Sequence, residues 1–147
     1  MRKRLILLFL GLMLAGCGTA NQSNEPKSDG SGIVAGEVTA VLKETSPMIF
    51  QYVVRNQTEK EVKLEFSSSQ RFDYSVETQP GEQLYLFSSL TMFMAVLGEE
   101  TIKQGESLNY DIDLHELGLK AGSYHLNVWM TPKDGKAYLV TKEFTVK

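Results

Sequence analysis

Cysteine and histidine are scarce in this 147-residue chain, which has one cysteine and two histidines. The single cysteine, Cys17, excludes an intrachain disulfide. His115 and His125, without a second cysteine, make no plausible zinc site, because structural zinc takes four Cys or His ligands. A seryl nucleophile needs a general base within hydrogen-bond reach, and the serines at 67–69 lie in no Gly-x-Ser-x-Gly setting. We therefore expect no enzyme activity, no metal and no other cofactor.

The chain also lacks an excess of basic residues. Its 15 lysines and arginines stand against 18 aspartates and glutamates, a formal net charge of −3. A nucleic-acid partner requires a basic patch for its phosphates, and electrostatic binding to anionic lipid requires a polybasic segment. The composition indicates neither kind of interaction.

The apolar run at the start of the chain is too short to cross a membrane. Three basic residues at positions 2–4 precede 12 uncharged, largely apolar residues at 5–16, whereas a spanning helix needs about 20 apolar residues. This pattern is typical of a signal peptide. Its last residues, Leu14-Ala15-Gly16-Cys17, resemble the lipobox of bacterial lipoproteins. The alternative is an ordinary secretory signal with an accidental cysteine.

On the lipoprotein interpretation, residues 1–16 are removed and Cys17 is acylated. Two or more acyl chains on Cys17 would hold the protein stably in a bilayer. The remaining chain has 12 basic and 18 acidic residues, a net charge of −6. Residues 18–32 contain no aromatic residue, Leu, Ile or Val, so they have too little apolar surface to fold. We expect an extracytoplasmic, lipid-anchored protein in which residues 17–32, the acylated cysteine and a flexible tether, hold the domain about 20 Å from the membrane.

A single domain is expected over residues 33–147, where apolar and polar residues alternate. Strict alternation predicts strands with one buried face. The expected inward positions are Val38, Ala40, Leu42, Phe50, Tyr52, Val54, Val62, Leu64, Phe66, Phe72, Tyr74, Val76, Leu84, Leu86, Leu108, Tyr110, Ile112, Leu114, Tyr124, Leu126, Val128, Met130, Phe144 and Val146. Turn signals such as Pro80-Gly81 and Asp134-Gly135 recur about every ten residues. The pattern predicts an all-β, immunoglobulin-like antiparallel sandwich of seven to nine strands.

Two segments have distinct local patterns within this sandwich. Leu90, Phe93, Met94 and Leu97 fit one face of a helix, which predicts a short helical crossing near residues 90–97. The turn at residues 119–123 leads into a late strand, where Tyr124 is expected to fill a corner of the sandwich.

Residues 50–76, FQYVVRNQTEKEVKLEFSSSQRFDYSV, resemble the BsuPI family, which is named for an intracellular proteinase inhibitor of bacteria. Met92-Phe93, Gln104-Gly105-Glu106 and Ala121-Gly122-Ser123-Tyr124 follow in the family's order. The resemblance covers residues 34–147 and implies a single β-sandwich and proteinase inhibition. The founding type is intracellular, whereas the lipobox predicts export, so inhibition of a cytoplasmic proteinase is not transferred. No inhibitory residue is carried over from the family.

The serine-rich segment between Phe66 and Phe72 is the first candidate for partner binding. It consists of Ser67, Ser68, Ser69, Gln70 and Arg71. Serine hydroxyls bond nearby backbone groups, which favours a polar turn between two strands, with Phe66 and Phe72 anchored in the core. The alternative is a rigid loop presented to a partner. In that case Arg71 would fill the acidic specificity pocket of a trypsin-like enzyme.

Two further candidates are apolar. Met92, Phe93 and Met94 have soft side chains that could cover a groove on a partner. Trp129 lies on the strand face opposite the expected core, so it either contacts a partner or lies under a neighbouring strand or loop. The sequon Asn56-Gln57-Thr58 is interpreted as a turn.

The sequence therefore predicts a membrane-anchored lipoprotein that binds another protein, with a secreted or envelope proteinase as the expected target. The alternative function is a non-inhibitory interaction or structural module of the cell envelope, because a fold does not determine a function.

Overall fold

The computed structural model describes residues 36–147, which form nine strands and two short helices. The elements are β1 (Val38–Ser46), β2 (Ile49–Asn56), β3 (Val62–Phe66), β4 (Phe72–Thr78), β5 (Gln83–Leu86), α1 (Phe87–Leu90), β6 (Gly98–Ile102), β7 (Ser107–Asp113), the 3₁₀ helix η1 (His115–Leu117), β8 (Gly122–Met130) and β9 (Ala137–Val146). Every strand pairing in this region is antiparallel. The predicted all-β sandwich is confirmed.

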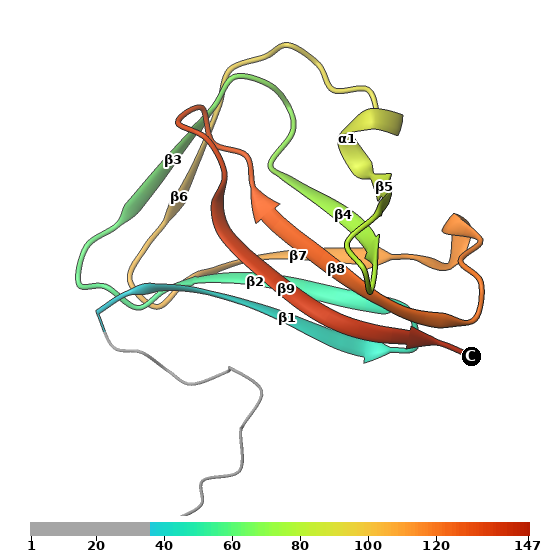
Figure 1. Cartoon of the computed structure of the whole chain (residues 1–147). Coiled ribbons are helices and arrows are strands. Elements are labelled where there is room, and N and C mark those ends of the chain that lie inside the picture. Colours follow the sequence, from blue (N-terminus) through green and yellow to red (C-terminus); the bar gives the residue numbers. More distant parts are fainter. Residues whose placement is uncertain (1–35) are drawn as a thin grey trace, which may run out of the picture.

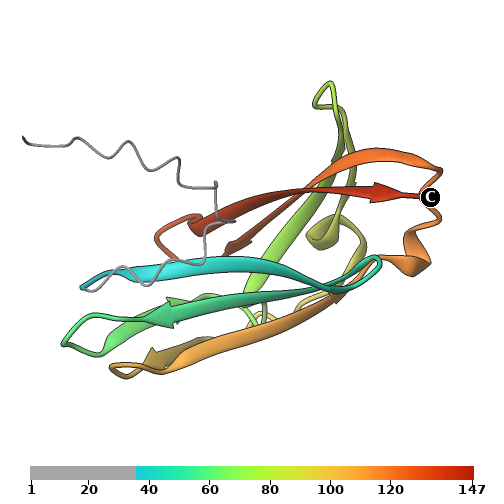
Figure 2. The same cartoon turned by 90° about the horizontal axis from the view of Figure 1, so that it is seen from below.

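Two sheets face each other, and a two-stranded ribbon extends from one side (Figure 1). One sheet has the order β1-β2-β7 and the other β5-β4-β8-β9, while β3 and β6 pair with each other. Figure 2 shows β1, β2 and β7 as one layer, with β8 and β9 in the other. β1 and β9 lie side by side where the layers meet (Figure 1).

The core is built mainly from the inward positions that the alternation predicts. Phe50, Tyr52, Val54, Val76, Leu126 and Val128 all have 0% exposure. The Tyr52 hydroxyl donates a hydrogen bond to the Tyr138 carbonyl at 2.6 Å. The Tyr124 hydroxyl donates to the Lys120 carbonyl four residues upstream at 2.8 Å, so the predicted tyrosine corner is confirmed.

Asn56, at the end of β2, is buried and binds the turn between β2 and β3 to the rest of the domain. Its side chain has 0% exposure and donates hydrogen bonds to the Lys60 carbonyl at 2.7 Å and the Ile102 carbonyl at 2.8 Å. Its Oδ1 accepts from the Thr58 amide at 2.9 Å and the Thr58 hydroxyl at 2.7 Å. The sequon is a turn, as predicted, and its asparagine is a structural residue.

The prediction for β5 is wrong about which residues face inward. Leu84 is 48% exposed, and Tyr85 is the residue that packs on the core, with its ring 5.6 Å from that of Tyr74. The pairing of β4 with β5 places Tyr85 opposite the buried Val76, and the register shifts after that pair. Cross-strand partners share a face, so Tyr85 follows Val76 into the core.

The predicted helical crossing is also misplaced. The helix α1 is one turn that ends at Leu90, and residues 91–97 have no regular structure. Leu90, Met94 and Leu97 are 73%, 72% and 85% exposed, so their helical spacing does not reflect a buried face. Neither helix within residues 36–147 is long and apolar enough to span a membrane.

Candidate functional site

Three loops lie together at one end of the sandwich, which we call the loop end (Figure 1). They are the serine loop (residues 67–71) between β3 and β4, the strap (residues 91–97) between α1 and β6, and the hairpin loop (residues 131–136) between β8 and β9. Two of the sequence candidates, the serine loop and the Met92–Met94 segment, are therefore parts of a single surface.

The serine loop is the turn between two strands that its composition predicts. The Ser68 hydroxyl accepts a hydrogen bond from the Gln70 amide at 3.2 Å. The Thr131 amide donates to the Arg71 carbonyl at 3.0 Å, and the Thr131 hydroxyl to the Gln70 carbonyl at 3.4 Å. Ser67 is exposed. Most of the loop's polar groups are thus occupied by the domain itself.

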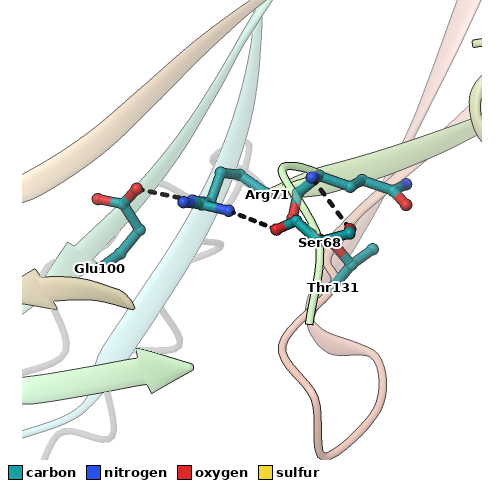
Figure 3. Close-up of polar contacts among 5 residues, drawn as sticks. Ser68, Arg71, Glu100 and Thr131 are labelled. Atoms are coloured by element: carbon teal, nitrogen blue, oxygen red, sulfur yellow. Dashed lines mark hydrogen bonds and ion pairs between the residues drawn. The ribbon is translucent and has the colours of Figure 1, made fainter. Parts of the chain in front are cut away.

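The guanidinium of Arg71 is bound within the domain, which supports the interpretation of residues 67–71 as a polar turn (Figure 3). Nε donates to Glu100 Oε1 at 2.8 Å, and Nη1 donates to the Ser68 carbonyl at 2.9 Å. The guanidinium also stacks over the Phe66 ring, 4.6 Å from its centroid. The side chain is only 24% exposed. Arg71 therefore joins the serine loop to β6.

Gly98, the first residue of β6, makes room for this arginine. A Cβ atom at this position would clash with the Arg71 guanidinium. The absence of a side chain at Gly98 therefore lets Arg71 lie flat across the start of β6 and reach Glu100.

The strap is the most exposed apolar part of the described chain. Seven large hydrophobic residues within residues 36–147 are exposed. Four of them belong to the strap, namely Met92, Met94, Val96 and Leu97, and a fifth, Leu90, directly precedes it. Met92 is 98% exposed and Met94 is 72% exposed. No charged side chain occurs between residues 83 and 98. Such a contiguous apolar surface is typical of an interaction site.

Ser69 fixes the strap to the serine loop through two hydrogen bonds to the same residue. The Ser69 amide donates to the Met94 carbonyl at 2.9 Å, and the Met94 amide donates to the Ser69 hydroxyl at 2.9 Å. Both backbone groups of Met94 are therefore satisfied by Ser69, while the Met94 side chain points to solvent.

A series of aromatic rings connects the strap to the core. Phe93 packs edge-on against Phe87 at 5.7 Å, and Phe87 stacks on Phe72 at 5.8 Å. Phe72 in turn lies 4.7 Å from Tyr110 of the opposite sheet. Burial raises the pKa of Tyr110 to about 12, because the phenolate would be poorly solvated there. Phe93, one of the predicted partner-binding residues, thus anchors the strap to the core.

The hairpin loop is the third segment of the loop end, and it is bound to β3. The Lys133 amide donates to the Glu65 carbonyl at 2.8 Å, and the Lys133 ammonium forms an ion pair with the Glu65 carboxylate. The hydrogen bond from Lys133 lowers the pKa of Glu65, and the same bond raises the pKa of Lys133. A shallow hollow of about 460 Å³ separates this loop from the strap, between Lys133 and Leu97.

Trp129 does not present its indole ring to solvent, although it lies on the outer face of its sheet. It is 5% exposed, and the Lys136 ammonium lies 3.8 Å from the centroid of its ring. The structure therefore supports the alternative in which Trp129 is covered by a neighbouring segment. Residues 36–147 contain no group of three potential metal ligands. Cys17 lies outside the described residues.

The model of the BsuPI family, described as intracellular proteinase inhibitor, matches residues 36–135. The matched region contains both sheets up to β8, the serine loop and the whole strap. Because the match spans most of the chain, the protein belongs to the BsuPI family. A search of curated proteins found no match.

Proposed function

We propose that this protein is a lipid-anchored, extracytoplasmic member of the BsuPI family that binds and inhibits a proteinase through its loop end. Membership of the family supports inhibition. The basic residues at 2–4, the short apolar run and the tetrapeptide ending in Cys17 support export and acylation. We choose the loop end as the binding surface because its apolar strap is exposed and is held on the domain by Ser69 and Phe93.

The position of the loop end suits a protein anchored through its N-terminal segment. The Gly36 amide donates to the Gln57 carbonyl at 3.1 Å, which fixes the start of the described domain beside the turn before β3. The serine loop follows the other end of β3 (Figure 1). A strand of this length spans about 17 Å. A tether that enters at Gly36 would therefore leave the loop end free to meet a partner.

Rigidity of the loop end also favours inhibition over weak, transient contact. A loop held in its bound conformation loses less entropy on binding. Small inhibitors often obtain this rigidity from disulfides, which a chain with a single cysteine cannot form within itself. Here the Ser69–Met94 bonds join the strap to the serine loop. The Arg71–Glu100 pair holds the serine loop on β6, and the Lys133–Glu65 pair holds the hairpin loop on β3.

The test is a titration of proteinase activity with the full chain purified in detergent. Proteinases from the secreted and envelope fractions of the source cell are each assayed at a fixed, known active-site concentration. An inhibitor should remove activity linearly up to a stoichiometric end point. If no proteinase from either fraction is inhibited at micromolar protein, the inhibitor proposal fails and the non-inhibitory envelope module takes its place.

A further inference from the structure

We propose that the strap enters the cleft of an endopeptidase in the manner of an extended substrate, with Met92 in an apolar primary specificity pocket. This inference rests on the proposed inhibitory function and names the contact residue and the class of partner.

The first support is the conformation of the strap. Thr91 has φ −119° and ψ 134°, which is extended backbone. Exposure then alternates over three residues: Met92 points to solvent, Phe93 is half-buried against Phe87, and Met94 points to solvent, whereas residues 95–97 are all exposed. A period of two is that of an extended strand, in which successive side chains point to opposite faces. Substrates and substrate-like inhibitors bind proteinases as extended segments that add to an enzyme strand.

The second support is an open backbone edge. In an extended segment the backbone groups of successive residues point to opposite edges. The N–H and C=O of Met94 point to Ser69, so those of Phe93 are expected at the other edge. No backbone hydrogen bond joins Phe93 to another residue within 36–147. The backbone groups of Phe93 are therefore free to bond an enzyme while Ser69 retains those of Met94.

The third support is the chemistry of the exposed side chains. Met92 is almost completely exposed, and its unbranched thioether chain adapts to narrow apolar slots. A trypsin-type pocket holds an aspartate and requires a cation, whereas a chymotrypsin-type pocket is a hydrophobic slot. Residues 83–98 supply no cation, and Arg71 is bound to Glu100. The strap therefore matches a proteinase with an apolar primary pocket.

The strap is also supported on both sides of Met92. The chain enters it from α1, whose Phe87 contacts Phe93. After Met94, the Val96 amide donates to the Met94 carbonyl at 2.9 Å, which turns the chain toward β6. Met92 is thus an almost fully exposed residue of a short segment that is held at both ends, which suits entry into a narrow cleft.

The experiment compares chymotrypsin with trypsin, two enzymes that share a fold and differ in their primary pocket. The full chain in detergent is expected to inhibit chymotrypsin and to leave trypsin active. Replacing Met92→Lys should weaken inhibition of chymotrypsin by roughly thirtyfold or more, as for loss of a central contact residue, and should create inhibition of trypsin. Leu139→Lys is the matched control, because Leu139 is also an exposed apolar residue (59%) but lies on β9.

Each other outcome overturns a defined part of the inference. If chymotrypsin is inhibited equally by the wild type, Met92→Lys and Met94→Lys, the strap is not the contact, although inhibition stands. If Met94→Lys rather than Met92→Lys changes the specificity, the choice of Met92 as pocket residue is wrong. Inhibition of trypsin alone by the wild type, or of neither enzyme, overturns the apolar pocket. Unchanged thermal melting of each variant ensures that loss of folding does not imitate these results.

Discussion

The methionines differ in solvent exposure, so those of the strap can be oxidised selectively. Met92 and Met94 are exposed, whereas Met130 has 0% exposure. Oxidation converts a flexible apolar thioether into a polar sulfoxide and disrupts methionine-rich interfaces. Hydrogen peroxide should therefore oxidise Met92 and Met94 first and abolish inhibition of chymotrypsin, while Met130 stays reduced in the folded protein. Peptide mass spectrometry of samples taken during inactivation would measure this order.

The control for this prediction is a double variant, Met92→Leu with Met94→Leu. Leucine keeps the volume and the apolar character of methionine at little cost. The variant should inhibit as the wild type does and should retain inhibition after peroxide. Loss of its inhibition under peroxide would show that oxidation acts elsewhere.

Asn56 is the residue whose loss should most affect stability without touching the loop end. Its buried amide satisfies the Lys60 and Ile102 carbonyls and the Thr58 amide. Asn56→Ala removes the buried donor to the Ile102 carbonyl and the acceptor of the Thr58 amide, so we expect it to lower the free energy of unfolding by about 2–4 kcal/mol. Urea unfolding would measure the change.

Asn109→Ala is the matched comparison, because Asn109 is exposed and makes one long bond of 3.4 Å to the Ser107 carbonyl. This substitution should change the free energy of unfolding by no more than about 0.5 kcal/mol. Equal effects of the two substitutions would contradict a structural role for the buried asparagine.

Residue types alone predicted some roles correctly and could not predict others. Tyr124 was identified from its turn and its position in the strand, both of which are local. The sequence leaves two alternatives open for Arg71 and for Trp129, because the contacts of both side chains are set by the three-dimensional fold. Glu100 lies 29 residues from Arg71, and Lys136 reaches Trp129 across a hairpin. No spacing in the sequence indicates either contact.

At the scale of elements, Arg71 connects the serine loop to β6. Arg71→Ala removes two hydrogen bonds and the stacking on Phe66, so it should lower the free energy of unfolding by about 1–2 kcal/mol. The Ser69–Met94 bonds remain, and inhibition of chymotrypsin should change less than for Met92→Lys. A well-folded Arg71→Ala protein that has lost all inhibition would restore the serine loop as the contact surface.

The contribution of the Glu65–Lys133 ion pair to the stability of the fold should depend on pH. Lys133 lowers the pKa of Glu65 below its ordinary value of 4.5, so this group stabilises the fold above about pH 4.5. That contribution is lost as the pH falls through the lowered pKa of the folded state. The stability difference between wild type and Glu65→Gln should therefore shrink on acidification. Because both side chains are exposed, added salt should shrink it too.

The strands were predictable as elements because each has its own alternation, and the turns because glycine or asparagine marks them. The strap was not predictable by the same logic. Its apolar residues do not face the core, so their helical spacing carried no information about burial. For β5, the deciding fact was a register relative to β4, which the sequence of β5 does not contain.

At the scale of the whole molecule, the proposed anchor makes a separate prediction. Cys17→Ser removes the thiol that would carry the acyl chains, so the variant should lack a lipid label and leave the membrane fraction unless its signal peptide remains uncleaved. Ser23→Ala, in the expected tether, should behave as the wild type. Metabolic labelling with a fatty acid and immunoblotting of membrane fractions would measure both. A Cys17→Ser protein that still carries the label contradicts the lipoprotein proposal.

The class of fold and the family followed from the sequence because they depend on features repeated along the whole chain. Alternation and turns define the sandwich, and the family model matches residues 36–135. The loop end could not be predicted in this way, because three segments far apart in sequence meet there only in the folded structure.

The two bonds between Ser69 and Met94 also determine what happens if the bound proteinase cuts the strap after Met92. The new amino group on Phe93 would not diffuse away, because Phe87 holds its ring and Ser69 holds the next residue. It would remain beside the acyl group from which it was severed, at a high effective concentration. Resynthesis of the peptide bond then competes with release, and the nicked chain continues to occupy the enzyme. The same hydrogen bonds that shape the strap would thus prevent an inhibitor from being consumed as a substrate.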